Sequence, residues 1–476
     1  MFVDNKTTYL RRDIIATIAK LYFEDNLIEE IDRLPIKMIK KDAQPFRCCI
    51  YKDREMVKYR VIASLGFSLE NEYEIDNNLL SDYAKNSLER DKPNFPILTF
   101  IDEACKSCVR TNYFVTNVCK NCVAKPCIVN CPKDAIEIDN NQANIIPKKC
   151  VNCGLCMKVC PFHAIVYVPV PCEESCPVGA IIKDDNGKED IDYNKCIFCG
   201  KCSRACPFGA IMEKSQIIDV IKDIKNGKRL VAMLAPSIIG QFEGNIYQIA
   251  TALKEIGFKY VVEVALGADK TAAIESNEFI ERMEKGDKIM GTSCCPAYVE
   301  AVKKHSTDFL PFVSHAKTPM AYTAEIINEN LSDTIKVFIG PCVAKKHEGL
   351  NNPLIDYVLT FEELESLFIA KNINLTMIKE TKLDLDEATK IGRSFPVNTG
   401  VANALKETLK EKNINVKPVF INGFNKQNVK LLNIYAKGNC DGNLIEVMSC
   451  EGGCIAGPCV LNKPQDSIKK LNEFLK

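Results

Sequence analysis

The sequence predicts an α/β fold divided into several domains, and three observations support this prediction. The length of 476 residues suggests about two to four domains. Sixteen of the 25 cysteines fall between Cys105 and Cys206, in regularly spaced runs. After residue 228 the pattern changes to apolar runs of strand length that alternate with helical stretches, which is typical of parallel β-sheets flanked by helices.

The overall composition excludes some classes of partner. The formal net charge is zero, so neither a nucleic acid nor an anionic membrane surface is indicated. No apolar run approaches the ~18 residues that a membrane helix needs, and the start of the chain lacks the apolar core of a signal peptide. We therefore expect a protein of the reducing cytoplasm, in which cysteines serve as metal ligands rather than disulfides.

Residues 1–92 form a first domain whose function the sequence does not indicate. Apolar residues at helical spacing predict a helix from Tyr9 to Leu34, and the stretch from Met56 to Leu69 is interpreted as a pair of strands. Cys48 and Cys49 are the cysteines of this domain. An adjacent pair cannot supply the usual ligand set of a cluster, so both are interpreted as buried or incidental thiols.

Two further domains are predicted downstream. A stretch with two prolines at 92–96 marks the boundary to a cysteine-rich module at residues 93–214. The third domain spans residues 228–476. Its predicted strands lie at 230–235, 260–264, 335–339 and 357–360, and its clearest helices lie at 246–256 and 362–370.

A short repeat occurs four times in the cysteine-rich module. The pattern Cys-Pro-x-x-Ala-Ile begins at Cys131, Cys160, Cys176 and Cys206. The runs that start at Cys150 and Cys196 have the C-x2-C-x2-C-x3-C spacing of bacterial ferredoxins, and the run from Cys119 is a wider variant. Structural zinc is the alternative, but zinc sites use paired C-x2-C units rather than such runs. The repeats therefore predict [4Fe–4S] clusters.

The ligand sets follow from the way such runs cross over. Three thiolates of one run point into a cavity, and the fourth ligand comes from the partner run. The half-run Cys172-x3-Cys176 finds its missing Cys-x2-Cys upstream at Cys105 and Cys108, so one two-cluster module is nested in a loop of another. This nesting resembles the four-cluster electron-transfer subunits of molybdopterin oxidoreductases. The four predicted sets are Cys119, Cys122, Cys127 and Cys160; Cys150, Cys153, Cys156 and Cys131; Cys105, Cys108, Cys172 and Cys206; and Cys196, Cys199, Cys202 and Cys176.

Three motifs in the third domain carry the remaining chemistry. They are Thr292-Ser-Cys294-Cys295-Pro-Ala-Tyr298, Gly340-Pro-Cys342-Val-Ala-Lys345-Lys-His-Glu348 and Glu446-Val-Met448-Ser-Cys450-Glu-Gly-Gly-Cys454. In this order, behind a ferredoxin-type module, they resemble the three active-site signatures of [FeFe] hydrogenases. The resemblance covers about residues 228–460. The fold class it implies is a nested double ferredoxin-like α+β Fe–S module followed by a hydrogenase domain with parallel β-sheets flanked by helices.

The resemblance also implies a cofactor and its ligands. The cofactor is the H-cluster, a [4Fe–4S] cluster joined to a di-iron subsite that carries CO, cyanide and azadithiolate. Lys345 is implied as a hydrogen-bond donor to a cyanide, and Met448 as a residue that packs at the subsite. The implied protein ligands are Cys295, Cys342, Cys450 and Cys454, of which Cys454 is shared with the subsite.

A proton relay is implied in the same way. Cys294 matches the family's proton carrier, a role that a thiol in a cationic or metal environment can fill. Ser314, Glu275 and Glu278 match the other members of the relay. The alternatives are a packed thiol for Cys294, a structural hydroxyl for Ser314 and a solvated helix face for the two glutamates.

Three positions depart from the family pattern. Gly340 stands where the family usually has Met, Tyr298 replaces Trp, and Ile-Ala-Gly-Pro-Cys459 follows Cys454 in place of a run of glycines. The set is similar to the branch often called group B, and it implies altered surroundings of the site. No role is assigned to Cys440 or Cys459.

Together these features predict a ferredoxin-linked [FeFe] hydrogenase that interconverts H2 with two protons and two electrons. Electrons are expected from a ferredoxin or a similar small carrier, and maturation enzymes are expected to install the di-iron subsite. An Fe–S assembly protein and a hydrogen sensor with little turnover are the alternatives. Lys345 and Cys294 favour the enzyme over an assembly protein, because neither is needed to hold a cubane cluster.

Overall fold

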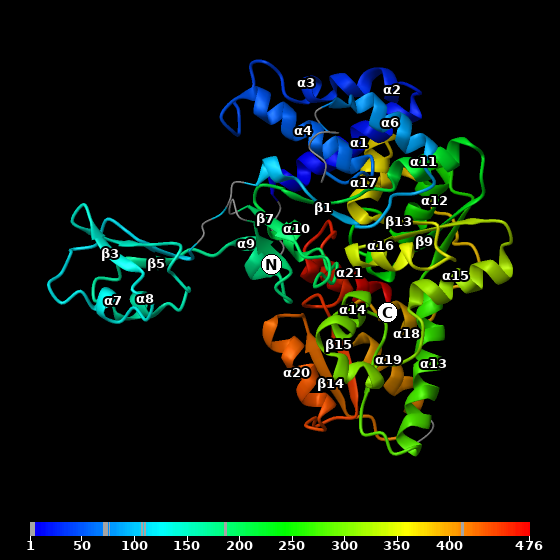
Figure 1. Ribbon diagram of the computed structural model, residues 1–476. Coiled ribbons are helices and arrows are strands. Elements are labelled where there is room, and N and C mark those ends of the chain that lie inside the picture. The colour runs from blue at the N-terminus through cyan, green and yellow to red at the C-terminus, as the bar shows by residue number, and fades with distance from the viewer. Residues whose placement is uncertain are drawn as a thin grey trace.

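The computed structural model describes residues 5–69, 75, 77–105, 108, 111–184, 188–410 and 414–476 (Figure 1). In these ranges it shows a group of N-terminal helices, a module of short antiparallel strand pairs, and a C-terminal region with two parallel sheets. None of the helices in these ranges is long and apolar enough to cross a membrane. Figure 1 shows one lobe of the module, in cyan, lying to the side of the rest of the molecule.

The N-terminal domain is helical where it is described. Its helices are α1 (Lys6–Phe23), α2 (Leu27–Glu30), α3 (Leu34–Met38), α4 (Ile50–Ser64) and α6 (Leu80–Glu89). The single helix expected at 9–34 is broken after Phe23, because Asp25 adopts a left-handed φ of 63° and α2 starts anew after Asn26.

The strand pair expected at 56–69 is wrong. This stretch belongs largely to α4, and the chain turns after Ser64. Met56, Val57 and Val61 are buried at a spacing that places them on one helix face. The sequence pattern misleads here because Val57, Tyr59 and Val61 alternate with basic residues, as in a strand.

Helix α1 attaches the N-terminal domain to the other two parts. It packs on α17 (Phe361–Ala370) and on α11 (Ile217–Lys225). Arg11 lies in this contact and forms ion pairs with Glu362 of α17 and with Glu213 of the cysteine-rich module. A buried ion pair of this kind makes each partner dependent on the other, because an unpaired buried charge is costly.

The cysteine-rich module has a nested topology, as the sequence predicts. In the outer unit, β1 (Leu98–Phe100) pairs antiparallel with β8 (Ile211–Glu213), and β6 (Ile181–Lys183) pairs with β7 (Glu189–Ile191). Two short helices, α9 (Pro171–Ser175) and α10 (Lys201–Ala205), pack on each other. The first strand of this unit therefore pairs with its last, across a long insertion.

The insertion repeats the same plan. Its strands β2 (Tyr113–Val115) and β5 (Ile165–Tyr167) pair antiparallel, and β3 (Ile136–Asp139) and β4 (Gln142–Ile145) form the inner pair. Its helices α7 (Pro126–Val129) and α8 (Leu155–Val159) also pack on each other. This inner unit is the lobe at the side of Figure 1, so the nested double ferredoxin-like fold is confirmed.

The larger parallel sheet has the strand order β10-β9-β12-β13. Its strands are β9 (Leu230–Leu234), β10 (Tyr260–Glu263), β12 (Ile335–Gly340) and β13 (Tyr357–Thr360). These match the four predicted strands, and α12 (Ile246–Ile256) and α17 match the two predicted helices. All residues of β9 are buried, as expected for a central parallel strand covered on both faces.

A second parallel sheet was not predicted. It has the order β11-β15-β14, with β11 (Met290–Gly291), β14 (Pro418–Asn422) and β15 (Leu444–Met448). Its short first strand gives almost no sequence signal. The remaining helices are α13 (Ala265–Glu284), α14 (Pro296–His305), α15 (Pro319–Asn330), α16 (Val343–Leu350), α18 (Lys390–Arg393), α19 (Gly400–Leu409), α20 (Lys426–Ala436) and α21 (Pro464–Phe474). The 3₁₀ turns are η1 (Ile31–Arg33), η2 (Asp102–Ala104), η3 (Pro236–Ile238), η4 (Thr307–Phe312), η5 (Leu375–Met377) and η7 (Cys454–Ala456).

Candidate active site

A cavity of about 90 Å³ lies where the two parallel sheets meet. Its wall is almost wholly apolar, and it is formed by segments that directly follow strands: residues 235–237 after β9, 341–342 after β12, 294–297 after β11 and 449–450 after β15. Parallel α/β sheets commonly place ligand sites at the carboxyl ends of their strands. Here the carboxyl ends of both sheets contribute to one site.

The structure brings the four implied ligands of the cubane to this cavity. Cys295 and Cys342 directly precede α14 and α16, where backbone N–H groups at a helix start favour a thiolate. Cys450 follows β15, and Cys454 begins η7. All four line the cavity.

The electrostatics of these thiols fit a metal cluster. Burial, and then the nearby Cys295, raises the pKa of Cys342 to about 12. Burial, then Cys342 and Cys454, raises the pKa of Cys450 well above its ordinary value. Four neighbouring thiols, one buried and three partly buried, ionise together only if a positively charged group lies between them, and an iron–sulfur cluster is such a group.

The thiols do not converge on a single metal ion. Among the described residues, no group of three or more His, Cys, Asp or Glu side chains is drawn together closely enough for a single metal ion. A cubane is larger than one ion and takes its cysteines at separate corners. We therefore regard the donor set as suited to a [4Fe–4S] cluster.

Lys345 and Met448 lie in the same wall. Lys345 is placed by the first turn of α16, and its Nζ pairs with Glu348 at 2.7 Å. Glu348 also accepts a hydrogen bond from the Thr318 hydroxyl. These contacts hold a positive charge at the rim of an apolar space, where an anionic ligand atom would be favoured. Met448 ends β15 and is almost fully buried.

Cys294 links the cavity to a buried carboxylate. It lines the cavity beside Cys295, and burial followed by the charge of Glu275 raises its pKa well above the ordinary value. Glu275 belongs to α13 and is fully buried. Its Oε1 accepts hydrogen bonds from the backbone N–H of Ser293 at 2.8 Å and from the Ser293 hydroxyl at 2.9 Å.

Burial makes the Glu275 carboxyl group an unusually weak acid. Burial raises its pKa to about 7, against the hydrogen bonds from Ser293 and Ser314. A carboxyl group with this pKa is protonated in part of the molecules near neutral pH. It can therefore both accept and release a proton, as proton transfer requires.

A second carboxylate continues the line toward the surface. The Ser314 hydroxyl donates to Glu278 Oε2 at 2.7 Å, and Arg282 and His315 also contact Glu278. Burial acts to raise the pKa of Glu278, but the hydrogen bonds from Ser314, Arg282 and His315 outweigh it and hold the pKa below its usual range. The His315 side chain is 84% exposed, so the line of groups ends in solvent.

The cysteine-rich module brings together its predicted sets. In the inner unit, one hollow is lined by Cys119, Cys122, Cys127 and Cys160, and a second by Cys131, Cys150, Cys153 and Cys156. In the outer unit, burial, then Glu189, then Cys206 and Cys108 raise the pKa of Cys172 to about 12. For Cys202 the pKa rises through burial and then through Cys199, Cys196 and Cys176. These interactions place the members of each outer set near one another.

Cys199 joins the module to the cavity. It belongs to the outer set of Cys196, Cys199, Cys202 and Cys176, yet it also lines the cavity of the four C-terminal thiols. Its pKa is raised to about 11, mainly by burial, and Cys295 contributes to the rise. Sequence spacing could not show which of the four sets lies beside the cavity.

Two parts of the chain match known protein families. Residues 228–458 match the family described as iron only hydrogenase large subunit, C-terminal domain, and residues 143–166 and 189–212 match the 4Fe-4S binding domain. This chain is a hydrogenase-like protein.

The relatives of this hydrogenase-like chain are distant. Iron hydrogenase 1 of Clostridium pasteurianum is 29% identical over 390 residues, which cover 68% of this chain and 66% of that protein. The NADP-reducing hydrogenase subunit HndD of Solidesulfovibrio fructosivorans is 29% identical over 66% of this chain and 56% of its own length. Protein NAR1 of Arabidopsis thaliana is 22% identical over 52% of this chain and 68% of its own. A variant of the [FeFe]-hydrogenase HydA1 from Chlamydomonas reinhardtii gives a TM-score of 0.45 at 19% identity, over 54% of this chain and 88% of that one.

The departures from the family motifs occupy different places in the hydrogenase-like chain. A Cβ at Gly340 would lie 2.5 Å from the ring of Phe338, which itself lines the cavity. The ring thus fills the space that a larger residue at 340 would need. Tyr298 is fully buried in α14, and its hydroxyl has no hydrogen-bond partner among the described residues. Cys459 lies outside the cavity wall, buried beside Glu213 and Glu362.

Sequence reasoning missed three groups of the relay. Ser293 holds Glu275 in place, although its position between Thr292 and Cys294 in the first motif was a signal. Arg282 lies one helical turn after Glu278, so the i, i+4 spacing on α13 pointed to it. His315 directly follows Ser314, which was the signal for it, and its Nδ1 lies 2.7 Å from Glu278 Oε1.

Proposed function

We propose that this chain is an [FeFe] hydrogenase that interconverts H2 with two protons and two electrons. The observation that carries the proposal is that one cavity gathers four thiols, a fixed lysine and Cys294. A line of carboxyl and hydroxyl groups leads from Cys294 to the surface, and a candidate cluster set abuts the cavity on another side. A cubane scaffold alone needs only the four thiols.

The cofactor proposed for this cavity is an H-cluster. Cys295, Cys342, Cys450 and Cys454 would hold its cubane, and Cys454 would be shared with a di-iron subsite carrying CO, cyanide and azadithiolate. When bound, this group supplies the metal chemistry that splits and forms the H–H bond. Lys345, held in place by Glu348, would donate a hydrogen bond to a cyanide of this group. The apolar wall, including Met448, keeps water away from the metal.

The residues of the chain move the protons. Glu278, in contact with exposed His315, takes protons from solvent. The Ser314 hydroxyl can donate and accept at once, so it passes a proton between Glu278 and Glu275. Glu275, with a pKa of about 7, releases it toward Cys294 at neutral pH. Cys294 is the last protein group before the cofactor.

The module supplies the electrons in this proposal. Sixteen cysteines would hold four [4Fe–4S] clusters, which would supply electron transfer, and the set containing Cys199 lies beside the cavity. The partner is a ferredoxin or a similar small carrier, and dedicated maturation enzymes insert the di-iron subsite. Neither a nucleic acid nor a membrane takes part.

An Fe–S assembly function is the second candidate. The similarity to protein NAR1 of Arabidopsis thaliana, 22% identical, favours it. An assembly protein has no use for a buried carboxyl relay or for a lysine fixed at an anion-binding wall. A hydrogen sensor with little turnover would keep both features. It would differ from the proposed enzyme only in its rate of H2 turnover.

The test is to mature the protein anaerobically and to record its infrared spectrum together with H2 evolution from a reduced dye. We expect CO and cyanide bands, steady turnover, and about 22 iron atoms per chain on the ligand count. Absence of the bands after competent maturation would refute the hydrogenase proposal in favour of assembly. Bands with negligible turnover would favour the sensor. Cys440→Ser, outside the cavity and the cluster sets, is the matched control and should behave as the wild type.

A further inference from the structure

Cys48 and Cys49 form a pair of thiols that the proposed hydrogenase chemistry does not use. Cys48 is exposed and Cys49 is half-buried, so of the two thiols interpreted as buried or incidental, Cys48 is not buried. Their sulfur atoms lie 3.9 Å apart. Two thiols at this separation need only a small movement to form a bond.

The position of the pair activates Cys49. It directly precedes α4, a helix of 15 residues. The pKa of the Cys49 thiol lies below its usual range, chiefly because the backbone N–H of Lys52 donates a hydrogen bond to the sulfur. A thiolate at a helix N-terminus is the form that attacks a disulfide.

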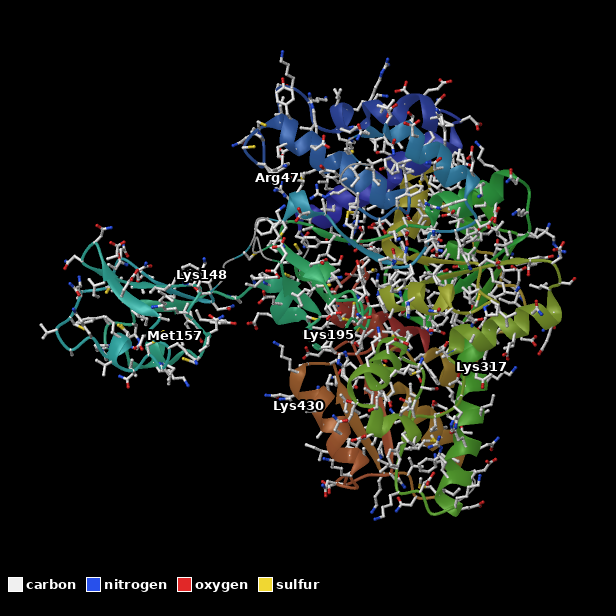
Figure 2. All side chains as sticks on the ribbon, viewed as in Figure 1. Arg47, Lys148, Met157, Lys195, Lys317 and Lys430 are labelled. Carbon is white, nitrogen blue, oxygen red and sulfur yellow. The ribbon has the colours of Figure 1, made fainter. Side chains whose placement is uncertain are left out.

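The segment that carries the pair is anchored to the cysteine-rich module. Arg47 donates a hydrogen bond to the carbonyl oxygen of Ala104 at 2.9 Å, and Lys52 forms an ion pair with Glu103. Both contacts fall within two residues of Cys105 in the chain. Figure 2 labels Arg47 at the edge of the N-terminal helices. The thiols are therefore held in place rather than carried on a free loop.

The charge around the pair is mainly positive. Arg47 and Arg54 donate hydrogen bonds to neutral carbonyl oxygens, and both Arg47 and Lys52 act on the single carboxylate of Glu103. Lys6 lies over the ring of Phe46 at 5.6 Å. The nearby acid Asp53 is buried and accepts a hydrogen bond from the backbone N–H of Phe46. An anionic molecule is thus favoured at the exposed face of the thiols.

We propose that Cys48 and Cys49 form a thiol–disulfide exchange site for an anionic disulfide. The Cys49 sulfur attacks one sulfur of R–S–S–R, so that its S–S bond breaks and one R–SH leaves. The Cys48 sulfur then attacks Cys49 in the mixed disulfide and releases the second R–SH. The two cysteines lose two electrons and two protons, and the disulfide gains both.

The exchange is reversible because the product is strained. Neighbouring residues have Cα atoms only about 3.8 Å apart, whereas a relaxed disulfide spans about 4.4–6.8 Å. Strained and exposed disulfides are the easily reduced, exchanging ones rather than structural ones. The site is independent of the proposed hydrogenase activity and can be tested whether or not that activity is found.

The experiment uses the full-length protein with its clusters loaded anaerobically, treated with glutathione disulfide as the anionic probe. Trypsin cuts after Arg47 and Lys52, so peptide 48–52 contains both thiols and no other cysteine. After alkylation of free thiols, mass spectrometry should find this peptide closed by an internal disulfide, and dithiothreitol should reopen it. The Cys48→Ser and Cys49→Ser variants should not form this internal disulfide, whereas Cys440→Ser should form it as the wild type does.

The charge of the probe is tested separately. Cystamine is a cationic disulfide of similar reactivity. At low salt it should form the Cys48–Cys49 disulfide severalfold more slowly than glutathione disulfide does. The difference should shrink at high salt, because exposed charges are then screened. A peptide that keeps both thiols free, or stops at the mixed disulfide, would refute the exchange site. Equal rates for the two probes at low salt would refute the preference for an anion.

Discussion

The acidity of Glu275 gives the sharpest test of the site. Burial raises its folded-state pKa from 4.5 to about 7. Below pH 4.5 the folded and unfolded states are both protonated, so the group costs nothing. Between the two values the unfolded state has released its proton and the folded state has not, so stability falls as the pH rises. Above pH 7 the full cost is about 3 kcal/mol, at about 1.4 kcal/mol per pH unit.

Glu275→Gln removes this ionisation and keeps the shape of the side chain. Its amide oxygen can still accept the two hydrogen bonds from Ser293. The variant should therefore match the wild type in acid and exceed it in base. Between pH 5.5 and 8.5 its advantage should grow by about 2 kcal/mol, or about 0.7 M in the urea midpoint at about 3 kcal/mol/M.

The assay is anaerobic urea unfolding followed by far-UV circular dichroism, since the chain contains no Trp. Loss of clusters makes unfolding of such a chain irreversible, so midpoints are compared between variants at equal cluster content. Glu278→Gln is the matched control, and its expected change in stability has the opposite sign. The pKa of Glu278 is lowered, so its carboxylate stabilises the fold above its unfolded pKa, and the variant should lose stability near neutrality. A difference between Glu275→Gln and the wild type that is flat or falls with pH would refute the reasoning.

Three further predictions follow from particular contacts. Cys294→Ala should keep the CO and cyanide infrared bands of matured protein but lose most H2 turnover, because it removes the last proton carrier; undiminished turnover would exclude Cys294 from the relay. Tyr298→Phe removes a buried hydroxyl that has no hydrogen-bond partner among the described residues, and it should raise the unfolding midpoint by the equivalent of about 1 kcal/mol; a lowered midpoint would show that the hydroxyl is satisfied. Arg11→Met removes the cation that forms ion pairs with Glu362 and Glu213 and should cost about 3–5 kcal/mol. That loss should appear as faster proteolysis between the N-terminal helices and the rest, and an unchanged digestion rate would contradict it.

The N-terminal helices show where local sequence patterns misled. Met56, Val57 and Val61 form one helix face, but the intervening polar residues also allow alternation typical of strands. The final choice came from packing, because α4 buries that face against α1 and α3. The parallel strands of the larger sheet were clear by contrast, since a central strand buried on both faces is apolar at every position.

The sequence by itself determined the cysteine-rich module. Ligand spacing is local, and the broken run at Cys172 could be completed only by Cys105 and Cys108, so the nesting later seen in the pairing of β1 with β8 was already specified. The motif cysteines at the cavity were indicated by their resemblance to a known family, whereas β11 and β15, the strands that precede the cysteines of two of the motifs, were not predicted.

Only the tertiary structure decided how these parts meet. Cys199 lines the cavity, and Ser293 forms hydrogen bonds with Glu275. Cys459 is buried near Glu213, Glu362 and Arg11, away from the cavity wall. Each of these relations joins segments that are far apart in the chain or set apart by a turn. They depend on how two parallel sheets, a module and a helical domain pack together, which no spacing within one segment encodes.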